Sequence, residues 1–164
     1  MSPSNRINTE IPKIILKAYT ENSLQIRAFS FEAEGKEYKS CQFDLNQKKC
    51  IYREAKTTPK KFGQFVTFWK RNKEKITEPF HTNDPIDFYL VTTKSENKFG
   101  QFIFPRTILL EKNIISTDKK EGKRGFRIYP IWDTPENKQA KKTQQWQLNY
   151  FFEFNSKVNL KELF

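Results

Sequence analysis

The chain has 164 residues, which is the size of one domain, and we expect residues 1–164 to form a single domain. Charged residues make up 30% of it and no apolar run is long enough to cross a bilayer, which excludes a membrane-spanning helix and predicts no membrane partner. Residues 1–10 are polar and lack the apolar core of a secretory signal, so we expect a cytoplasmic protein.

Few residues are suited to metal binding or to nucleophilic catalysis. Cys41 and Cys50 have neither a CxxC spacing nor the spacing of a zinc site, which suits a reducing compartment. One histidine and five glycines leave little for histidine-based catalysis or for a glycine-rich phosphate loop. We therefore expect no metal and no cofactor.

The first predicted element is a helix that begins at Pro12. Proline is favoured at the first helical position, where its missing N–H would have no helical partner, and Ile11, Ile15 and Tyr19 recur on one face. Residues 24–31 follow, in which apolar and polar side chains alternate.

The next segments predict strands. Residues 38–45 and 50–56 indicate a β-hairpin whose turn contains Asn46-Gln47. Pro59 ends the second strand because proline cannot donate a hydrogen bond to a neighbour. Residues 64–69, rich in aromatic and β-branched side chains, predict a third strand.

The middle of the chain predicts the centre of the sheet. Residues 87–92 include a continuous apolar run, which is typical of a strand covered on both faces. Residues 100–104 predict a similar strand that ends at Pro105. Residues 106–112 then predict a short helix, with Asn113 in the left-handed conformation that closes a helix.

The last predicted elements are a strand and a helix. Residues 126–131 predict the strand, which follows a polar loop over residues 116–125. Thr134 is a favourable N-cap and Pro135 a favourable first residue for the helix. Its apolar side chains continue at near-helical spacing to Phe154, so we expect this helix to pack on the sheet.

Positive charge is concentrated in two stretches of a chain whose net charge is +11. Residues 53–75 hold eight basic and two acidic side chains, a net charge of +6, and residues 119–142 hold eight basic and three acidic ones, a net charge of +5. This segregation favours nucleic acid as the partner, because clustered charge raises the local potential. A solvated basic face without a partner is the alternative.

Five motifs lie at residues 53–71, 85–88, 100–105, 122–130 and 139–147. They resemble the MepB family, whose name reflects its occurrence beside a multidrug efflux pump and the repressor of that pump. The resemblance extends from about residue 32 to residue 152. The resemblance implies an α/β fold with a central mixed β-sheet flanked by helices, similar to the PD-(D/E)xK nuclease core. It also implies that the catalytic set of those nucleases has been lost.

The residues at the expected nuclease positions agree with that loss. Such nucleases need two carboxylates that hold a divalent metal and a lysine that prepares the attacking water. Asp87 matches the first carboxylate, whereas Gln101 and Ile103 stand where the second acid and the lysine would be. One carboxylate is a poor magnesium site, so we expect no enzyme activity and no catalytic residue. The alternative role of Asp87 is to cap the turn after Pro85.

Two further metal sites are conceivable from the sequence. Asp44, Glu54 and Lys56 would form a nuclease site if both carboxylates pointed the same way, and the alternative is a solvated strand face with Lys56 toward phosphate. His81 near Asp84 is the other candidate, and the alternative is an exposed loop histidine.

Ten basic residues are the candidate phosphate contacts. They are Lys56, Lys60, Lys61, Lys70, Arg71, Lys123, Arg124, Arg127, Lys141 and Lys142. Trp132 and Tyr129 are candidate stacking platforms for bases, which favours RNA or single-stranded DNA over duplex DNA. No helix-turn-helix or RNP motif is present, so we expect binding that tolerates sequence.

We therefore expect a monomeric, non-catalytic nucleic-acid-binding protein. One alternative is a divalent-metal-dependent nuclease that uses Asp44, Glu54 and Lys56, or Asp87. Another is an interaction module that recruits an acidic protein as an accessory factor of a drug-resistance operon.

Overall fold

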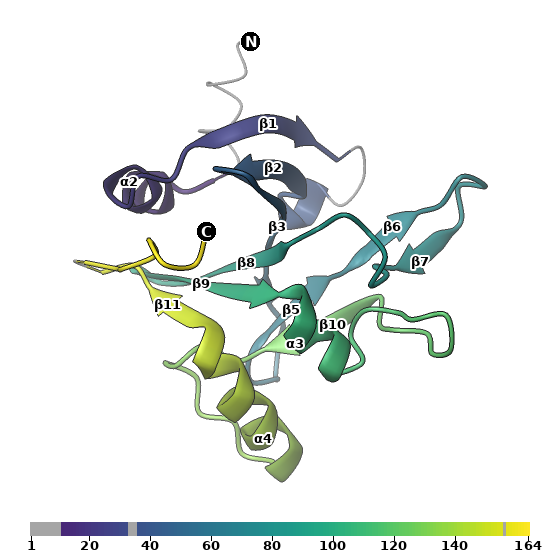
Figure 1. Ribbon diagram of the computed structural model, residues 1–164. Helices are drawn as coiled ribbons and strands as arrows, with labels where there is room; N and C mark the ends of the chain where they lie inside the picture. Colours follow the sequence, from purple (N-terminus) through teal and green to yellow (C-terminus); the bar gives the residue numbers. More distant parts are fainter. Residues whose placement is uncertain (1–10, 33–35, 156) are drawn as a thin grey trace.

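A six-stranded mixed β-sheet forms the centre of the computed structural model, which describes residues 11–32, 36–155 and 157–164 (Figure 1). In spatial order its strands are β1 (Ile26–Phe31), β2 (Cys41–Leu45), β3 (Lys48–Glu54), β8 (Phe88–Ser95), β9 (Lys98–Pro105) and β11 (Phe151–Glu153). β3 and β8 are parallel, and the other neighbours are antiparallel. The mixed sheet and its helices confirm the predicted α/β class. The polar segment 1–10 lies outside the described residues.

Local sequence patterns account for the hairpin and for the centre of this sheet. Leu45 pairs with Lys48, so the predicted turn at Asn46-Gln47 has two residues, and Asn46 has a φ of 54°. β8 lies between β3 and β9, as its apolar run predicts. Tyr89, Leu90 and Val91 on β8 are fully buried, because both faces of the strand are covered.

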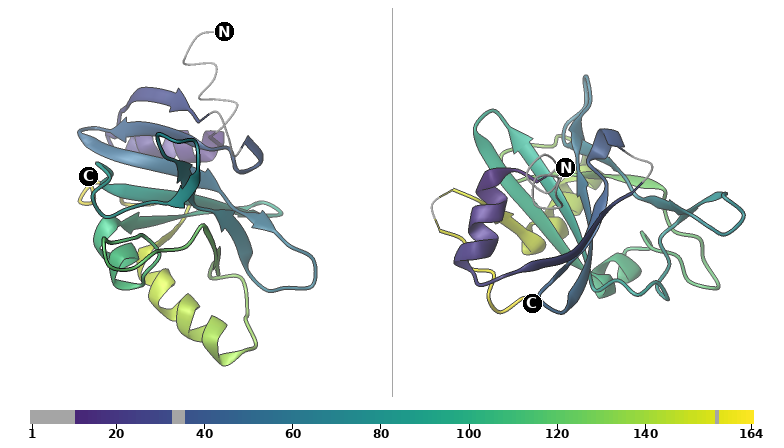
Figure 2. Two further views of the ribbon diagram at one scale, coloured as in Figure 1. Left: turned by 90° about the vertical axis from the view of Figure 1, so that its right-hand side faces the viewer. Right: turned by 90° about the horizontal axis from the view of Figure 1, so that it is seen from above.

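Helices cover both faces of the sheet (Figures 1 and 2). On one face, α2 (Lys13–Glu21) and the C-terminal residues enclose an apolar cluster with β2 and β3. On the other face, α3 (Arg106–Glu111) and α4 (Lys138–Gln147) pack over β8 and β9. Trp146 of α4 lies 5.7 Å from Phe104, which confirms that this helix packs on the sheet.

Two smaller sheets complete the fold, and the three-stranded one packs in the same apolar cluster as Trp146 of α4. β10 (Gly125–Ile128), β5 (Gln64–Thr67) and β4 (Lys56–Thr57) form one of them, in this order. β6 (Trp69–Arg71) and β7 (Thr77–Pro79) form a hairpin that extends away from the central sheet (Figure 1). The predicted strand over residues 64–69 is thus divided at Phe68, whose N–H donates to the carbonyl of Arg124 at 2.8 Å.

The boundaries predicted for the last helix are wrong. The N-cap is Asn137, whose side-chain oxygen accepts from the N–H of Ala140 at 2.7 Å, and Thr134 lies before it. The helix ends at Gln147, followed by a short 3-10 helix (Leu148–Tyr150) and by β11. Helical spacing did not reveal β11, because its pairing with β9 is a long-range interaction.

The other helices are close to their predicted positions. Pro12 is the N-cap residue of α2 and not its first helical residue, while Ile15 and Tyr19 are buried as predicted. α3 is followed by Asn113 with a φ of 59°, the predicted left-handed conformation. A further 3-10 helix spans Lys36–Tyr38. No helix in the described ranges is both long enough and apolar enough to cross a membrane.

Candidate functional site

The pairing of β5 with β10 brings the two basic stretches of the sequence together. Gly125 pairs with Thr67 and Ile128 with Gln64, in antiparallel register. β4, β5 and β6 belong to the first basic stretch and β10 to the second, so these elements share one region of the molecule. The two basic stretches therefore meet at these strands.

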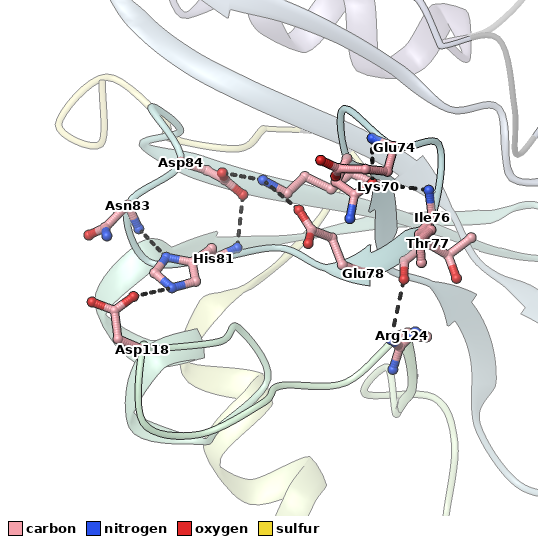
Figure 3. A network of polar contacts seen from close by, with 11 residues as sticks. Lys70, Glu74, Ile76, Thr77, Glu78, His81, Asn83, Asp84, Asp118 and Arg124 are labelled. Carbon is pink, nitrogen blue, oxygen red and sulfur yellow. Dashed lines mark hydrogen bonds and ion pairs between the residues drawn. The ribbon is translucent and has the colours of Figure 1, made fainter.

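At the β6–β7 hairpin, acidic side chains bind the converging cations (Figure 3). Lys70 Nζ lies 2.5 Å from Asp84 Oδ1 and 3.6 Å from Glu78 Oε1. Arg124 forms an ion pair with Glu121 at 2.7 Å and donates to the carbonyl of Thr77. Neutralised in this way, Lys70 and Arg124 contribute less to an anion-binding surface than their sequence positions suggest.

Lys56 and Arg127 lie on either side of Phe65 in the three-stranded sheet. Lys56 is 3.7 Å from Glu37 and its Nζ lies over the ring of Tyr38. Arg127 donates to the carbonyls of Phe62 and Gly63 and to the hydroxyl of Thr58, so it holds the loop over residues 58–63 in place. Arg127 is therefore a structural residue here.

The remaining predicted lysines are open to solvent. Lys60, Lys61, Lys123, Lys141 and Lys142 are exposed, and none of them has an ion pair with another described residue. Lysines without a local partner keep their full charge available for phosphate. We call these five residues the open lysines.

The aromatic platforms differ from those predicted. Tyr129 is only 9% exposed, and Trp132 is half-buried with its ring 5.6 Å from that of Phe151. The indole nitrogen of Trp132 is buried, with no hydrogen-bond partner among the described residues. Neither ring offers a free face comparable to that of Phe62, which is 47% exposed beside Lys60 and Lys61.

The residues predicted at degenerate nuclease positions do not form one site. Gln101 pairs with Thr92, and Thr92 lies five residues beyond Asp87 in the chain. Gln101 and Asp87 are therefore about 16 Å apart along the strands. Gln101 is fully buried, where it accepts from the Tyr19 hydroxyl at 2.7 Å and donates to Thr92. Ile103 is also buried, in the apolar cluster under α2. The register of β8 and β9 thus separates the proposed counterparts.

Asp87 has a structural role instead. Its carboxylate accepts from the N–H of Lys49 at 2.9 Å, and its own N–H donates to the carbonyl of Lys49. These bonds connect β3 with the residue before β8, so the predicted capping of the turn after Pro85 is replaced by a bridge between strands.

The alternative metal sites do not assemble either. Asp44 pairs with Lys49, which lies five residues before Glu54, so the backbone positions of Asp44 and Glu54 are about 16 Å apart along β3. Glu54 forms an ion pair with Lys94 at 2.8 Å. His81 is half-buried, and its Nε2 lies 3.2 Å from Asp118 (Figure 3). Within the described ranges no group of three or more His, Cys, Asp or Glu residues is placed to hold a metal.

A pocket that the sequence did not predict opens beside β3. Its volume is about 450 Å³, and its lining includes Arg53, Glu32, Trp69, Phe80 and Asp84. Arg53 is 2% exposed; one of its Nη atoms donates to the carbonyl of Tyr52 and the other to Glu32 at 2.7 Å. Burial raises the pKa of Glu32 above its ordinary value, and the Arg53 guanidinium opposes this shift. This pocket combines buried charge with aromatic walls.

One signal in the sequence could have revealed this pocket. Arg53 directly follows the apolar residues Cys50, Ile51 and Tyr52, and all four are buried on β3. Arginine is almost never fully buried without a partner, so its place in such a run indicates a paired charge inside the fold.

The chain is similar in sequence and in fold to known proteins. The family model described as MepB-like matches residues 32–153. A crystal structure of MepB superposes with a TM-score of 0.79 at 32% identity, covering 90% of this chain and 99% of that one. A bacterial homing endonuclease, I-Ssp6803I, has a TM-score of 0.47 and 11% identity over 92% of this chain and 94% of its own, a likeness that says nothing about activity. No curated protein sequence matches the chain. Because the family model matches most of the chain and a crystal structure of MepB is similar over 90% of it, the chain belongs to the MepB-like family.

Proposed function

We propose that this protein is a non-catalytic nucleic-acid-binding protein that prefers RNA or single-stranded DNA and acts as a cytoplasmic monomer. The pairing of β5 with β10 is the observation that carries the proposal. It joins two basic segments that lie about 60 residues apart in the sequence, and the open lysines belong to these segments. Open lysines that lie in one region of the molecule can contact several phosphates of one strand at the same time.

The affinity would come from phosphate contacts and from stacking. Each lysine that neutralises a phosphate releases counterions, so the logarithm of the binding constant falls linearly with the logarithm of the salt concentration. Phe62 is exposed beside Lys60 and Lys61, in a position to stack on an unpaired base. Stacking of this kind contributes about 1–3 kcal/mol per base and tolerates any sequence.

The absence of catalysis is part of the proposal. The Asp87 carboxylate is engaged with the N–H of Lys49, and Gln101 and Ile103 are buried and separated from it by the register of β8 and β9. Two-metal or one-metal hydrolysis needs adjacent anionic oxygens that this arrangement does not supply. We expect labelled RNA and DNA to stay intact with Mg²⁺ or Mn²⁺ present, and divalent-metal-dependent cleavage would contradict this part of the proposal.

The binding proposal is tested by fluorescence anisotropy with a labelled single-stranded oligonucleotide over a salt series. Replacing Lys60 and Lys61 by Gln should weaken binding and reduce the salt slope by about 1.4, because two phosphate contacts of about 0.7 each are lost. Lys48 and Lys49, another exposed adjacent pair at the far end of β3, are the matched control, and K48Q/K49Q should leave the slope unchanged.

Two results would refute the proposal. One is the absence of binding at low salt to single strands of either RNA or DNA. The other is binding whose strength does not depend on salt, because an interaction with phosphates requires counterion release. Tighter binding to duplex than to single strands would overturn the stated preference alone.

A further inference from the structure

The charges inside the pocket beside Arg53 are already paired. Arg53 contacts Glu32 at 2.7 Å, and Lys70 contacts Asp84 and Glu78. A free anion entering the pocket would have to compete with carboxylates for both cations. The interior is therefore better suited to a ligand group that is neutral and polar than to a phosphate or carboxylate.

The walls of the pocket favour a flat ligand. Trp69 and Phe80 line it together with Ile51 and Ile86. The guanidinium of Arg53 lies 5.6 Å from the centre of the Phe80 ring, and that of Arg71 lies 5.5 Å from Trp69. Aromatic rings and guanidinium planes are the surfaces on which nucleobases stack.

Polar groups at the pocket can bind the edge of such a ring. Thr67 and Gln42 line it, and neither side chain has a hydrogen bond with another described residue. Glu32 presents a carboxylate, of which Oε2 accepts from Arg53. A nucleobase carries donors and acceptors along one edge, and amide, hydroxyl and carboxylate groups can satisfy them.

The rim of the pocket carries positive charge. Arg71 lines it and is exposed, and it follows Lys70 on β6. β6 continues from β5 in the same basic stretch that contains Lys60 and Lys61. A strand bound along this stretch would thus bring one of its nucleotides to the mouth of the pocket.

We propose that this pocket takes up one nucleobase that is turned away from its neighbours in the strand and lies against Trp69, with the phosphate of that nucleotide against Arg71 at the rim. The inference rests on the proposed function, because it assigns a base-binding position to the same nucleic-acid-binding protein. A volume of about 450 Å³ is within the range of small-ligand pockets, which accommodate a ring of this size.

The experiment compares two single strands of equal length, one with bases and one built entirely of abasic nucleotides. Wild-type protein should bind the strand with bases about tenfold more tightly. W69L should reduce this difference to the part that stacking on Phe62 supplies, with an unchanged affinity for the abasic strand and an unchanged salt slope. W69F, which keeps a stacking ring, should retain most of the difference.

A second variant tests the pocket independently, in case W69L does not fold. Gln42 is exposed on β2, so Q42L leaves the apolar clusters intact while it removes a polar group from the pocket. We expect it to weaken binding of the strand with bases only. Circular dichroism of each variant should match that of the wild type.

The outcomes separate the inference from the function on which it rests. If W69L and Q42L change nothing while wild type still distinguishes the two strands, the base pocket is refuted and the proposed function stands, with Phe62 as its stacking residue. If wild type binds both strands equally tightly, the base pocket and the stacking on Phe62 are both refuted, and only the phosphate binding of the proposed function remains. If neither strand binds but W69L abolishes binding of a nucleoside monophosphate measured by calorimetry, the base pocket is supported and the proposed function fails.

Discussion

Cys50 is fully buried in the apolar cluster that α2 shares with the sheet. Burial raises the pKa of its thiol to about 12; the backbone hydrogen bond with Leu45 opposes the shift, and Asp87 and Asp44 add to it. At neutral pH this cysteine is therefore a small, neutral core residue. Cys41 is buried in the same cluster, and both cysteines are free thiols.

The pKa of Cys50 predicts a loss of stability at alkaline pH. The unfolded chain loses this proton near pH 9 and the folded chain near pH 12, so the folded state holds more protons between these values and its stability falls as the pH rises. From pH 9 to pH 10 we expect the free energy of unfolding to fall by about 1 kcal/mol more in wild type than in C50A. Urea denaturation at the two pH values measures this, and equal losses would contradict it.

Among the elements, α4 begins where a side chain can satisfy its first N–H groups. Asn137 accepts from the N–H of Ala140, whereas Thr134 is exposed and three residues earlier. Both residue types are favourable N-caps, so local preference alone does not choose between them. The choice follows from packing, because Gln144 of α4 donates to the carbonyls of Pro130 and Asp133 and so fixes the preceding segment.

The cap gives a matched pair of variants. N137A should lower the free energy of unfolding by about 1 kcal/mol, because the Ala140 N–H loses its partner. T134A should change it by less than about 0.5 kcal/mol, as is usual for exposed positions without such a role. Thermal or urea denaturation of both variants checks the assignment, and a larger effect of T134A would reverse it.

At the scale of the whole molecule, the C-terminal residues dock against the first described helix. The Asn22 side chain, which follows α2, donates to the carbonyl of Val158 at 3.0 Å and accepts from the N–H of Leu160 at 2.8 Å. Leu160 is fully buried, and the ring of Phe164 lies 4.7 Å from that of Phe88. The two ends of the described chain thus close one face of the central sheet.

Docking of this segment predicts a large effect of one side chain. L160A should destabilise the fold by about 2–5 kcal/mol, the range for removing a buried leucine side chain. E162A, exposed two residues later, is the control and should be neutral within about 0.5 kcal/mol. Near-equal unfolding midpoints for the two variants would show that the segment does not contribute to the core.

Local patterns in the sequence predicted much of the fold. The Asn46-Gln47 turn, the left-handed Asn113 and the apolar run of β8 each depend on a few neighbouring residues, and each is confirmed. The short strand β11 was missed, because it is defined by pairing with β9 and carries no periodic signal of its own. Elements are thus predictable where their cause is local.

The candidate site depended more on tertiary structure. Register placed Gln101 about 16 Å from Asp87, and a shift in pairing is invisible in a sequence motif. Tyr129 is too buried to stack on a base, and Lys70 and Arg124 form ion pairs with acidic side chains. The pocket beside Arg53 arises only where β3, β6 and the segment before β8 meet.

The sequence by itself determined the MepB-like family, the α/β class and the concentration of positive charge in two stretches, because these depend on composition and on local motifs. Only the tertiary structure decided which cations stay open, which carboxylates lie far apart and which aromatic rings line a pocket. The physical reason is that pairing between distant strands sets the neighbours of each side chain, and these neighbours determine whether its charge is exposed, paired or buried.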